Sequence, residues 1–203
     1  MAVALFGAAL PAPWAWFAGC IFGVAFSMWL WVRDAVPRHI EQWQDGAEGE
    51  RMTEKALRPL EREGWLVEHD LAGLYGNVDH LVVSEAGVFV LDSKRWFGEV
   101  TVEGGTPTIT PRDNPDAAWS PTGLARRMRG LGFRQKDAIE RLTGVRTWVQ
   151  SVVVIWAPFE QQVVESDRVV YIHGDCLSGW LRARRRLLDP STVDRIRQKV
   201  RAG

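Results

Sequence analysis

Cysteine and net charge are both scarce in this sequence, and each scarcity excludes a class of protein. The only two cysteines among 203 residues, Cys20 and Cys176, cannot form a disulfide framework or a four-cysteine zinc site. The 25 basic and 25 acidic side chains cancel, which argues against a generic polycation that coats nucleic acid. The hydrophobic content of 46% excludes a disordered chain, and the length fits one domain of ordinary size.

Charge is unevenly distributed along the chain. Residues 1–32 contain no Asp, Glu, Lys, Arg or His. The segment from Arg33 to Trp119 has 9 basic and 17 acidic residues, whereas the segment from Ser120 to Gly203 has 16 basic and 8 acidic residues. A neutral total made of an acidic and a basic half suggests that one face of the protein meets an anionic partner.

The uncharged stretch over residues 14–32 has the length of a membrane span. Its 19 residues reach about 28 Å as a helix, close to the ~30 Å core of a bilayer. Trp14 and Trp16 lie near one end and Trp29 and Trp31 near the other, where membrane interfaces favour indole rings. A cleaved signal peptide is one alternative, but no basic residue precedes the stretch as a signal peptide requires. A buried core helix is the other, and such helices are rarely apolar on all sides for five turns.

We therefore predict an N-terminal membrane anchor over residues 1–32 and a soluble domain over residues 45–203. Residues 33–44 are expected to form a juxtamembrane helix or linker broken by Pro37. Arg33 and Arg38 follow the span directly, so the positive-inside rule places the domain in the cytoplasm. The expected location is the cell membrane, as a single-pass protein.

Hydrophobic periodicity and turn residues predict the elements of the domain. Helical spacing indicates a helix over residues 47–62, a basic helix over 123–142, and two further helices over about 175–188 and 191–201. β-rich runs predict strands over residues 65–69, 78–83, 88–94, 98–103, 106–110, 147–156 and 168–172. This order of elements predicts an α/β domain with a mixed sheet.

Two aspartates face each other in the hairpin predicted over residues 78–94. If the turn is centred on residues 85 and 86, Asp79 lies opposite Asp92, and Lys94 shares their face. Like charges opposite each other are destabilising, so Lys94, a shared proton or a divalent cation must compensate. Mg²⁺ suits the pair best because it takes oxygen ligands. A slip of one residue would place the carboxylates on opposite faces. His80 is expected to point away from this face as a structural histidine.

Three sequence blocks around these aspartates resemble the nuclease-related domain family, NERD, of the PD-(D/E)xK nuclease superfamily. The blocks are GAEGE at 46–50, GNVDHLVV at 76–83 and GVFVLDSK at 87–94. The resemblance covers about residues 45–142 and implies a restriction-endonuclease-like sheet flanked by helices. It also implies metal-dependent hydrolysis of phosphodiester bonds, with Asp79, Asp92 and Glu50 around Mg²⁺ or Mn²⁺ and Lys94 assisting catalysis. Glu48 is the alternative to Glu50.

Cations of the predicted helix over residues 123–142 are candidates for binding nucleic acid, with DNA expected ahead of RNA. A solvated surface and attraction to anionic lipids are the alternatives for this set, which comprises Arg126, Arg127, Arg129, Arg134 and Lys136. Gln135 joins the candidates because related nucleases often place a helical glutamine after the catalytic strand, and a solvated polar position is its alternative. The tryptophans of the domain, including Trp148, are expected in the core or at interfaces.

The sequence therefore predicts a membrane-anchored, Mg²⁺-dependent nuclease that hydrolyses nucleic acid. The alternative is a catalytically inactive domain of the same fold that tethers nucleic acid or a protein at the membrane.

Overall fold

The computed structural model describes residues 12–71 and 78–201, with side chains described for 20–30, 46–71 and 78–201. The chain forms two compact units, Met1–Gln44 and Asp45–Gly203. In the described part of the first unit, residues 20–30 are helical and their side chains are exposed. No helix among the described residues combines the length and apolar character needed to cross a bilayer. The span predicted over residues 14–32 therefore stays a prediction.

The first element is helix α2 (Ala12–Arg62), to which both units contribute residues. It includes residues 33–44, where the sequence led us to expect an interruption at Pro37. A proline costs a helix one backbone hydrogen bond and crowds the preceding turn, but a long helix can accommodate this as a kink. In the second unit, α2 ends at Arg62, two residues before the positive-φ Gly64.

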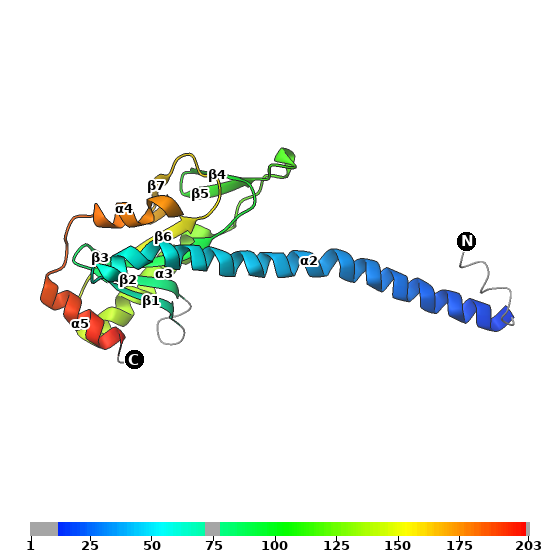
Figure 1. The fold of residues 1–203 in the computed structure, drawn as a ribbon, viewed down its shortest axis with the longest axis horizontal. Helices are drawn as coiled ribbons and strands as arrows, with labels where there is room; N and C mark the ends of the chain where they lie inside the picture. Colours follow the sequence, from blue (N-terminus) through cyan, green and yellow to red (C-terminus); the bar gives the residue numbers. More distant parts are fainter. Residues whose placement is uncertain (1–11, 72–77, 202–203) are drawn as a thin grey trace. The chain divides into compact units, whose positions relative to one another are not determined.

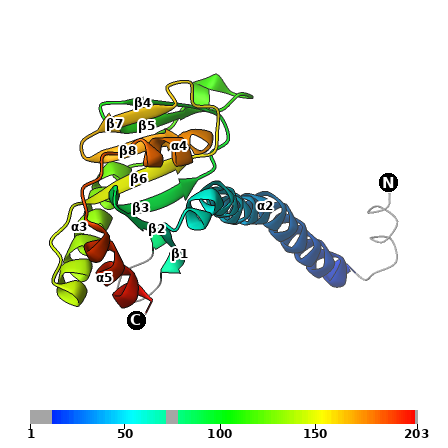
Figure 2. The ribbon, with the colours of Figure 1, turned by 60° about the vertical axis from the view of Figure 1, so that its left-hand side comes forward.

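A six-stranded mixed sheet forms the centre of the second unit (Figures 1 and 2). The strands lie in the order β1 (Leu66–Leu71), β2 (Val78–Ser84), β3 (Gly87–Lys94), β6 (Val149–Ile155), β8 (Val169–His173) and β7 (Val163–Ser166). β1, β2 and β3 are antiparallel neighbours, β3, β6 and β8 are parallel, and β7 returns antiparallel at the edge. This confirms the predicted α/β class and mixed sheet.

The remaining elements connect and cover these strands. Between β3 and β6 the chain forms the hairpin β4 (Glu99–Glu103) and β5 (Thr106–Thr110), the short helix η1 (Pro115–Ala117) and helix α3 (Leu124–Thr143). After β8 come η2 (Gly174–Cys176), α4 (Leu177–Arg182) and α5 (Pro190–Val200). The parallel pair β3 and β6 requires such a long crossover, and α3 supplies the helix that covers it.

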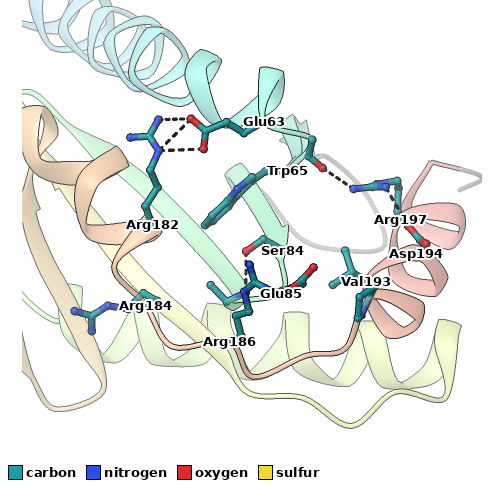
Figure 3. Close-up of a pocket in the computed structure, with 13 residues that line it drawn as sticks. Glu63, Trp65, Ser84, Glu85, Arg182, Arg184, Arg186, Val193, Asp194 and Arg197 are labelled. Atoms are coloured by element: carbon teal, nitrogen blue, oxygen red, sulfur yellow. Dashed lines mark hydrogen bonds and ion pairs between the residues drawn. The ribbon is translucent and has the colours of Figure 1, made fainter.

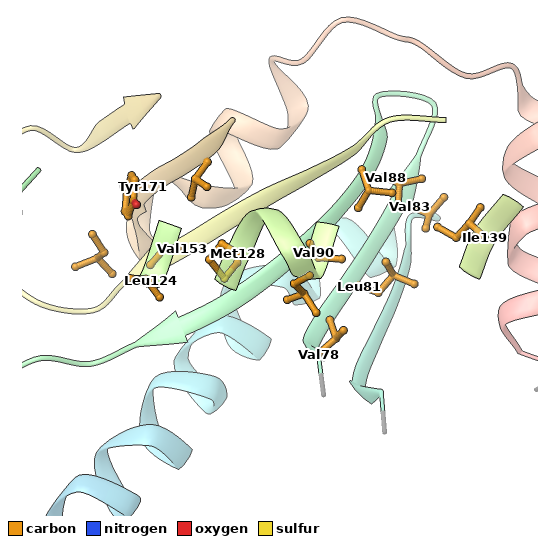
Figure 4. Close-up of a cluster of buried hydrophobic side chains, with 14 of the residues drawn as sticks. Val78, Leu81, Val83, Val88, Val90, Leu124, Met128, Ile139, Val153 and Tyr171 are labelled. Atoms are coloured by element: carbon orange, nitrogen blue, oxygen red, sulfur yellow. The ribbon is translucent and has the colours of Figure 1, made fainter. Parts of the chain in front are cut away.

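Alternating residues of the strands fill a separate core on each face of the sheet. On one face, Val88 and Val90 of β3 lie in a cluster with Met128 and Ile139 of α3 (Figure 4). On the other face, residues such as Leu91 join a cluster with α2 and α4 that includes Leu57, Leu60, Leu177 and Leu181. Burial of both faces explains why β2 and β3 read as nearly continuous apolar runs. By the same alternation, Asp79, Asp92 and Lys94 belong to the face of the sheet that α3 covers.

Candidate functional site: an acidic pair at the end of β2 and β3

The hairpin of β2 and β3 has the register predicted from the sequence. Ser84 pairs with Gly87 at the turn, and His80 pairs with Leu91 four residues along β2. The backbone ladder ends at this second pair, and Asp79 and Asp92 are the next residues on the two strands. The two aspartates therefore lie at the open end of the hairpin, where β3 continues beside β6 as far as the pair of Lys94 and Ile155.

Asp79 is fixed by a contact to the opposite strand. Its Oδ2 accepts a hydrogen bond of 2.9 Å from the backbone N–H of Ser93. Burial, and then the nearby carboxylate of Asp92, raise the pKa of Asp79 above its ordinary value, although the Ser93 N–H and the ammonium of Lys94 oppose them. Asp79 is thus held in place in a setting that disfavours its negative charge.

Asp92 and Lys94 form a close ion pair on β3. Lys94 Nζ lies 2.6 Å from Asp92 Oδ2, and the two side chains are 31% and 22% exposed. Asp92 Oδ2 is nevertheless buried and accepts no hydrogen bond. Lys94 therefore interacts with it through charge alone. The ammonium also donates to the backbone oxygen of Ser93 at 3.3 Å. One lysine is therefore paired with one of the two aspartates of the site.

Glu50 adds a third carboxylate from α2. Burial, and then the charges of Asp79 and Asp70, raise its pKa, while Lys94 lowers it. The preceding residue, Gly49, is buried against the end of β3, where an added Cβ would lie 3.4 Å from the Cβ of Arg95. A small residue at this position lets α2 approach the strand and brings Glu50 into the electrostatic field of Asp79.

Glu48 lies in a different setting from Glu50. Its side chain is 48% exposed and forms an ion pair of 3.6 Å with Arg51, one helical turn away. The structure therefore favours Glu50 over Glu48 as the helix carboxylate of the site.

The donor set of this site fits a hard divalent cation such as Mg²⁺ or Mn²⁺. Mg²⁺ takes oxygen ligands and is commonly held by one or two carboxylates, with water and substrate phosphate completing its shell. Asp79 and Asp92 provide such carboxylates, and the buried Asp92 Oδ2 lacks a hydrogen-bond donor. Among the described residues, however, no group of three or more His, Cys, Asp or Glu side chains is arranged to hold a metal ion. The fit is therefore that of a two-carboxylate site.

A buried polar network fastens α2 to the strand that carries Asp92. Thr53 Oγ1 donates to the backbone oxygen of Gly49 at 3.0 Å and contacts Ser93 Oγ at 2.7 Å. It also accepts from Trp156 Nε1 at 2.8 Å. The network was not anticipated from the sequence, because it joins residues 40 and 103 positions apart. The GxxxT spacing of Gly49 and Thr53 on one side of α2 is the local signal that could have indicated it.

His80 extends this network on the face opposite Asp79, as predicted. It is 1% exposed, and its ring nitrogens lie 3.3 Å from Ser93 Oγ and 2.7 Å from Nδ1 of His69. Burial, and then the neighbouring His69, lower the pKa of His80 to about 3. His80 is therefore neutral at physiological pH and serves the packing of β1, β2 and β3.

The cations predicted to bind nucleic acid lie along α3 in several settings. Arg126, Arg127 and Arg134 are exposed, and Arg127 donates to the backbone oxygen of Thr122 at 2.7 Å. Arg129 forms an ion pair with Asp167. Lys136 lies over the ring of Phe133, 5.6 Å from its centroid.

Gln135 differs from its neighbours on α3, because its side chain is completely buried. It lies on the side of the helix that carries Leu131, Ala138 and Ile139, which packs against the sheet. Neither of its amide atoms has a hydrogen-bond partner. This burial is at odds with both interpretations from the sequence, a contact to nucleic acid and a solvated polar position.

Three arginines at the end of α4 and shortly after it form ion pairs with carboxylates of the same chain. Arg182 binds Glu63, Arg184 binds Glu165 and Arg186 binds Glu85, with shortest distances of 2.6, 3.0 and 2.9 Å respectively. These arginines line a hollow of about 410 Å³ beside the turn of β2 and β3 (Figure 3). The hollow therefore lies at the end of the hairpin away from Asp79 and Asp92, and carboxylates compensate its positive charge.

The family of the chain follows from a sequence model that matches most of the region described above. The nuclease-related domain model, NERD, matches residues 45–156, more than half of the chain. The chain belongs to the NERD family. The matched range contains Glu50, Asp79, Asp92 and Lys94 as well as helix α3, and membership indicates a nuclease-related function and interaction with nucleic acid.

One curated relative matches part of the chain. The chain is 31% identical over 72 residues to an uncharacterized protein of Bacillus anthracis. The alignment covers 33% of this chain and 34% of the relative, so the chain matches only about a third of that protein's length. No solved structure matches the chain.

Proposed function

We propose that this NERD protein is a divalent-metal-dependent nuclease whose reactive centre is the pair Asp79 and Asp92. The observation that carries the proposal is the meeting of these two carboxylates where the β2–β3 ladder ends, with one lysine to compensate them. Two half-buried carboxylates with a single cation are costly unless a further positive charge joins them. Mg²⁺ or Mn²⁺ supplies such a charge and brings phosphate as a natural co-ligand.

Each residue of the site has a separate role in this proposal. Asp79 and Asp92 would hold the metal, and Glu50 would complete its shell through a water molecule. The metal, when bound, would lower the pKa of water and stabilise negative charge on a phosphate. The Ser93 N–H holds Asp79 in position without neutralising it. Lys94 contacts Asp92 Oδ2 and donates to the Ser93 oxygen, and its ammonium would stabilise charge that develops on a phosphate oxygen.

The activity test uses the full-length chain with plasmid DNA, single-stranded DNA and RNA, each with Mg²⁺ or Mn²⁺. Asp92→Asn and Lys94→Met should each lower the cleavage rate by about two orders of magnitude or more, because they remove a metal-holding carboxylate and a charge-stabilising cation. Asp113→Asn is the matched control, since Asp113 is exposed in a loop. Equal cleavage by the wild type and Asp92→Asn would exclude the Asp79–Asp92 pair as the reactive centre.

Metal binding is measured separately by thermal unfolding. Mg²⁺ or Mn²⁺ should raise the melting temperature of the wild type, because an ion that binds only the folded state stabilises it. The same ion should leave Asp92→Asn unchanged. A wild type that responds no more than this variant would argue against a metal at the pair.

We also propose that the N-terminal helix anchors the protein in the cell membrane as a single pass, with the NERD domain facing the cytoplasm. The support is the exposed apolar surface of Ile21, Phe22 and Phe26 together with the basic residues that begin at Arg33. Fractionation of cells into membrane and supernatant, with and without a carbonate wash, tests the anchor. Recovery of the full-length chain in the supernatant would contradict it.

A second function is an inactive domain of the same fold that binds nucleic acid. The observation in its favour is that the described residues contain no cluster of three candidate metal ligands. This function predicts binding that weakens steeply with salt and does not change in Asp92→Asn. The cleavage and metal assays therefore separate the two functions.

A further inference from the structure

A hollow of about 370 Å³ lies beside α3, on a part of the domain that the acidic pair does not use. We call it the α3 hollow. Its lining residues include Arg126, Arg129, Phe133, Lys136, Trp148 and Arg168, together with the small residues Gly130 and Gly132. Along α3 these residues extend from position 126 to 136, which corresponds to about 15 Å of helix.

Positive charge in the α3 hollow exceeds negative charge. Four cationic side chains line it, and no carboxylate does. Arg129 is compensated by Asp167, and Lys136 Nζ lies 3.9 Å from the carboxylate of Asp137. The hollow near α4 differs, because three of its arginines are matched by carboxylates at 3.0 Å or less. The α3 hollow therefore suits a polyanion.

Two aromatic rings of the α3 hollow are turned toward solvent rather than toward the core. Phe133 is 62% exposed and Trp148 is 51% exposed. A cation lies near each ring: Lys136 is 5.6 Å from the centroid of Phe133, and Arg168 is 5.7 Å from that of Trp148. Exposed aromatic faces alternating with cations are the arrangement by which proteins bind unpaired bases and the phosphates between them.

We propose that the α3 hollow is a binding site for single-stranded nucleic acid. Bases stack on Phe133 and Trp148, while Arg126, Lys136 and Arg168 contact phosphates. The proposal deepens the nuclease function and rests on it for the class of ligand. A single strand is required because the faces of paired bases are covered by their neighbours in a duplex and cannot stack on a protein ring.

The α3 hollow is separate from the acidic pair on the sheet. Val149, in its lining, pairs with Val88 at the start of β3, whereas Lys94 pairs with Ile155 at the other end of the two strands. Lys94 lies six positions along the strand from Val88, which is about 20 Å. The hollow can therefore hold a strand without blocking the carboxylates, and binding can be measured independently of cleavage.

The test measures binding of the full-length chain to fluorescent oligonucleotides by anisotropy, with EDTA present to prevent cleavage. The probes are a 20-nucleotide dT strand and a 20-base-pair duplex. Trp148→Ala and Phe133→Ala should each weaken binding of the single strand by about 5- to 100-fold, the range for loss of one base–aromatic stack. Trp148→Phe and Phe133→Tyr keep a ring and should retain most of the affinity.

Charge and surface controls accompany these variants. Lys136→Ala should reduce the slope of log affinity against log salt by about 0.7, as expected for one lost phosphate contact to a single strand. Arg195→Ala removes an exposed arginine outside the hollow and should have no comparable effect on the affinity. Because Phe133 and Trp148 are exposed, their variants should fold, and circular dichroism checks this.

Three results would overturn the proposal. They are a wild type that binds neither probe, affinities of both alanine variants within twofold of the wild type, and tighter binding of the duplex with the same losses on mutation. Ring-dependent binding of the single strand by a protein that cleaves nothing would support the α3 hollow and refute only the nuclease activity. Binding that does not depend on the two rings, by a protein that cleaves normally, would refute the α3 hollow and support the nuclease activity.

Discussion

The carboxylate of Asp79 accepts a hydrogen bond from the backbone of Ser93 where the pairing of β2 and β3 ends. The acid of one strand is thereby positioned by the strand that carries Asp92 and Lys94. Burial and the charge of Asp92 raise the pKa of Asp79, so the folded protein binds its proton more tightly than the unfolded chain does. A raised carboxyl pKa weakens folding where the group must ionise, at pH values above its ordinary pKa of about 4.

We expect Asp79→Asn to be more stable than the wild type at pH 7–8 without metal, because asparagine keeps an oxygen for the Ser93 N–H and removes the buried charge. The advantage should shrink as the pH falls towards 4 and disappear below it, where both folded and unfolded wild type are protonated at this position. A tenfold difference in proton affinity corresponds to about 1.4 kcal/mol. Urea unfolding across this pH range measures the difference. An advantage independent of pH would show that charge is not its cause.

Thr53→Val should lower the free energy of unfolding by about 2 kcal/mol or more. The substitution preserves shape but leaves Trp156 Nε1 and Ser93 Oγ without Thr53 Oγ1, and an unsatisfied buried polar group costs about 1–3 kcal/mol. Thr53→Ser keeps the hydroxyl and should cost much less. Urea unfolding at pH 7 gives both values. A valine variant within about 0.5 kcal/mol of the wild type would mean that the network contributes little.

Gln135→Met should be neutral or stabilising by up to about 2 kcal/mol. The side chain is fully buried and both of its amide atoms lack partners, so an apolar side chain of similar volume relieves a desolvation cost. Its melting temperature and its affinity for single-stranded DNA should both remain at or above the wild-type values. Destabilisation by more than 1 kcal/mol would require a hydrogen-bond partner for Gln135 that the structure does not contain.

Gly132→Ala should destabilise the domain by about 1–3 kcal/mol, the range for overpacking. A Cβ at this position of α3 would lie 2.6 Å from Ser151 Oγ, which donates to the backbone oxygen of Met128. Removing that hydroxyl in Gly132→Ala/Ser151→Ala should recover part of the loss. A double-mutant cycle on unfolding free energies measures the coupling, and strictly additive effects would refute the steric explanation.

The acidic hairpin was predictable because its information is local. A short turn fixes the register, and alternation then fixes which side chains share a face. The pairings of Ser84 with Gly87 and of His80 with Leu91 follow directly, and Asp79 and Asp92 are the next residues on the two strands. Strand β7 (Val163–Ser166) was missed, because a four-residue edge strand carries little periodic pattern. The helix expected over residues 175–188 ends at Arg182, since the arginines after it are engaged by Glu165 and Glu85 from other elements.

The α3 hollow was not predictable because its rings and cations come from separate segments. Trp148 was expected in the core or at an interface, and only folding brings it beside α3 and Arg168. Gln135 could have been placed correctly: it lies four residues from both Leu131 and Ile139, within the apolar stripe of α3. A polar residue in such a stripe is easily taken for a surface position when the residues around it are basic.

β3 has a neighbouring strand on each side, β2 and β6, whereas β1 and β7 form the margins of the sheet. Local opening of a protein starts where few contacts restrain the backbone, so deuterium exchange should reach the β3 amides only through nearly global unfolding. Asp92 and Lys94, which lie beyond the last β2 pair, are held to this protected strand and to β6 during the fluctuations that loosen the periphery. A variant with a substitution outside β3 that loses function while β3 stays protected from exchange has therefore not lost it through disorder of this strand.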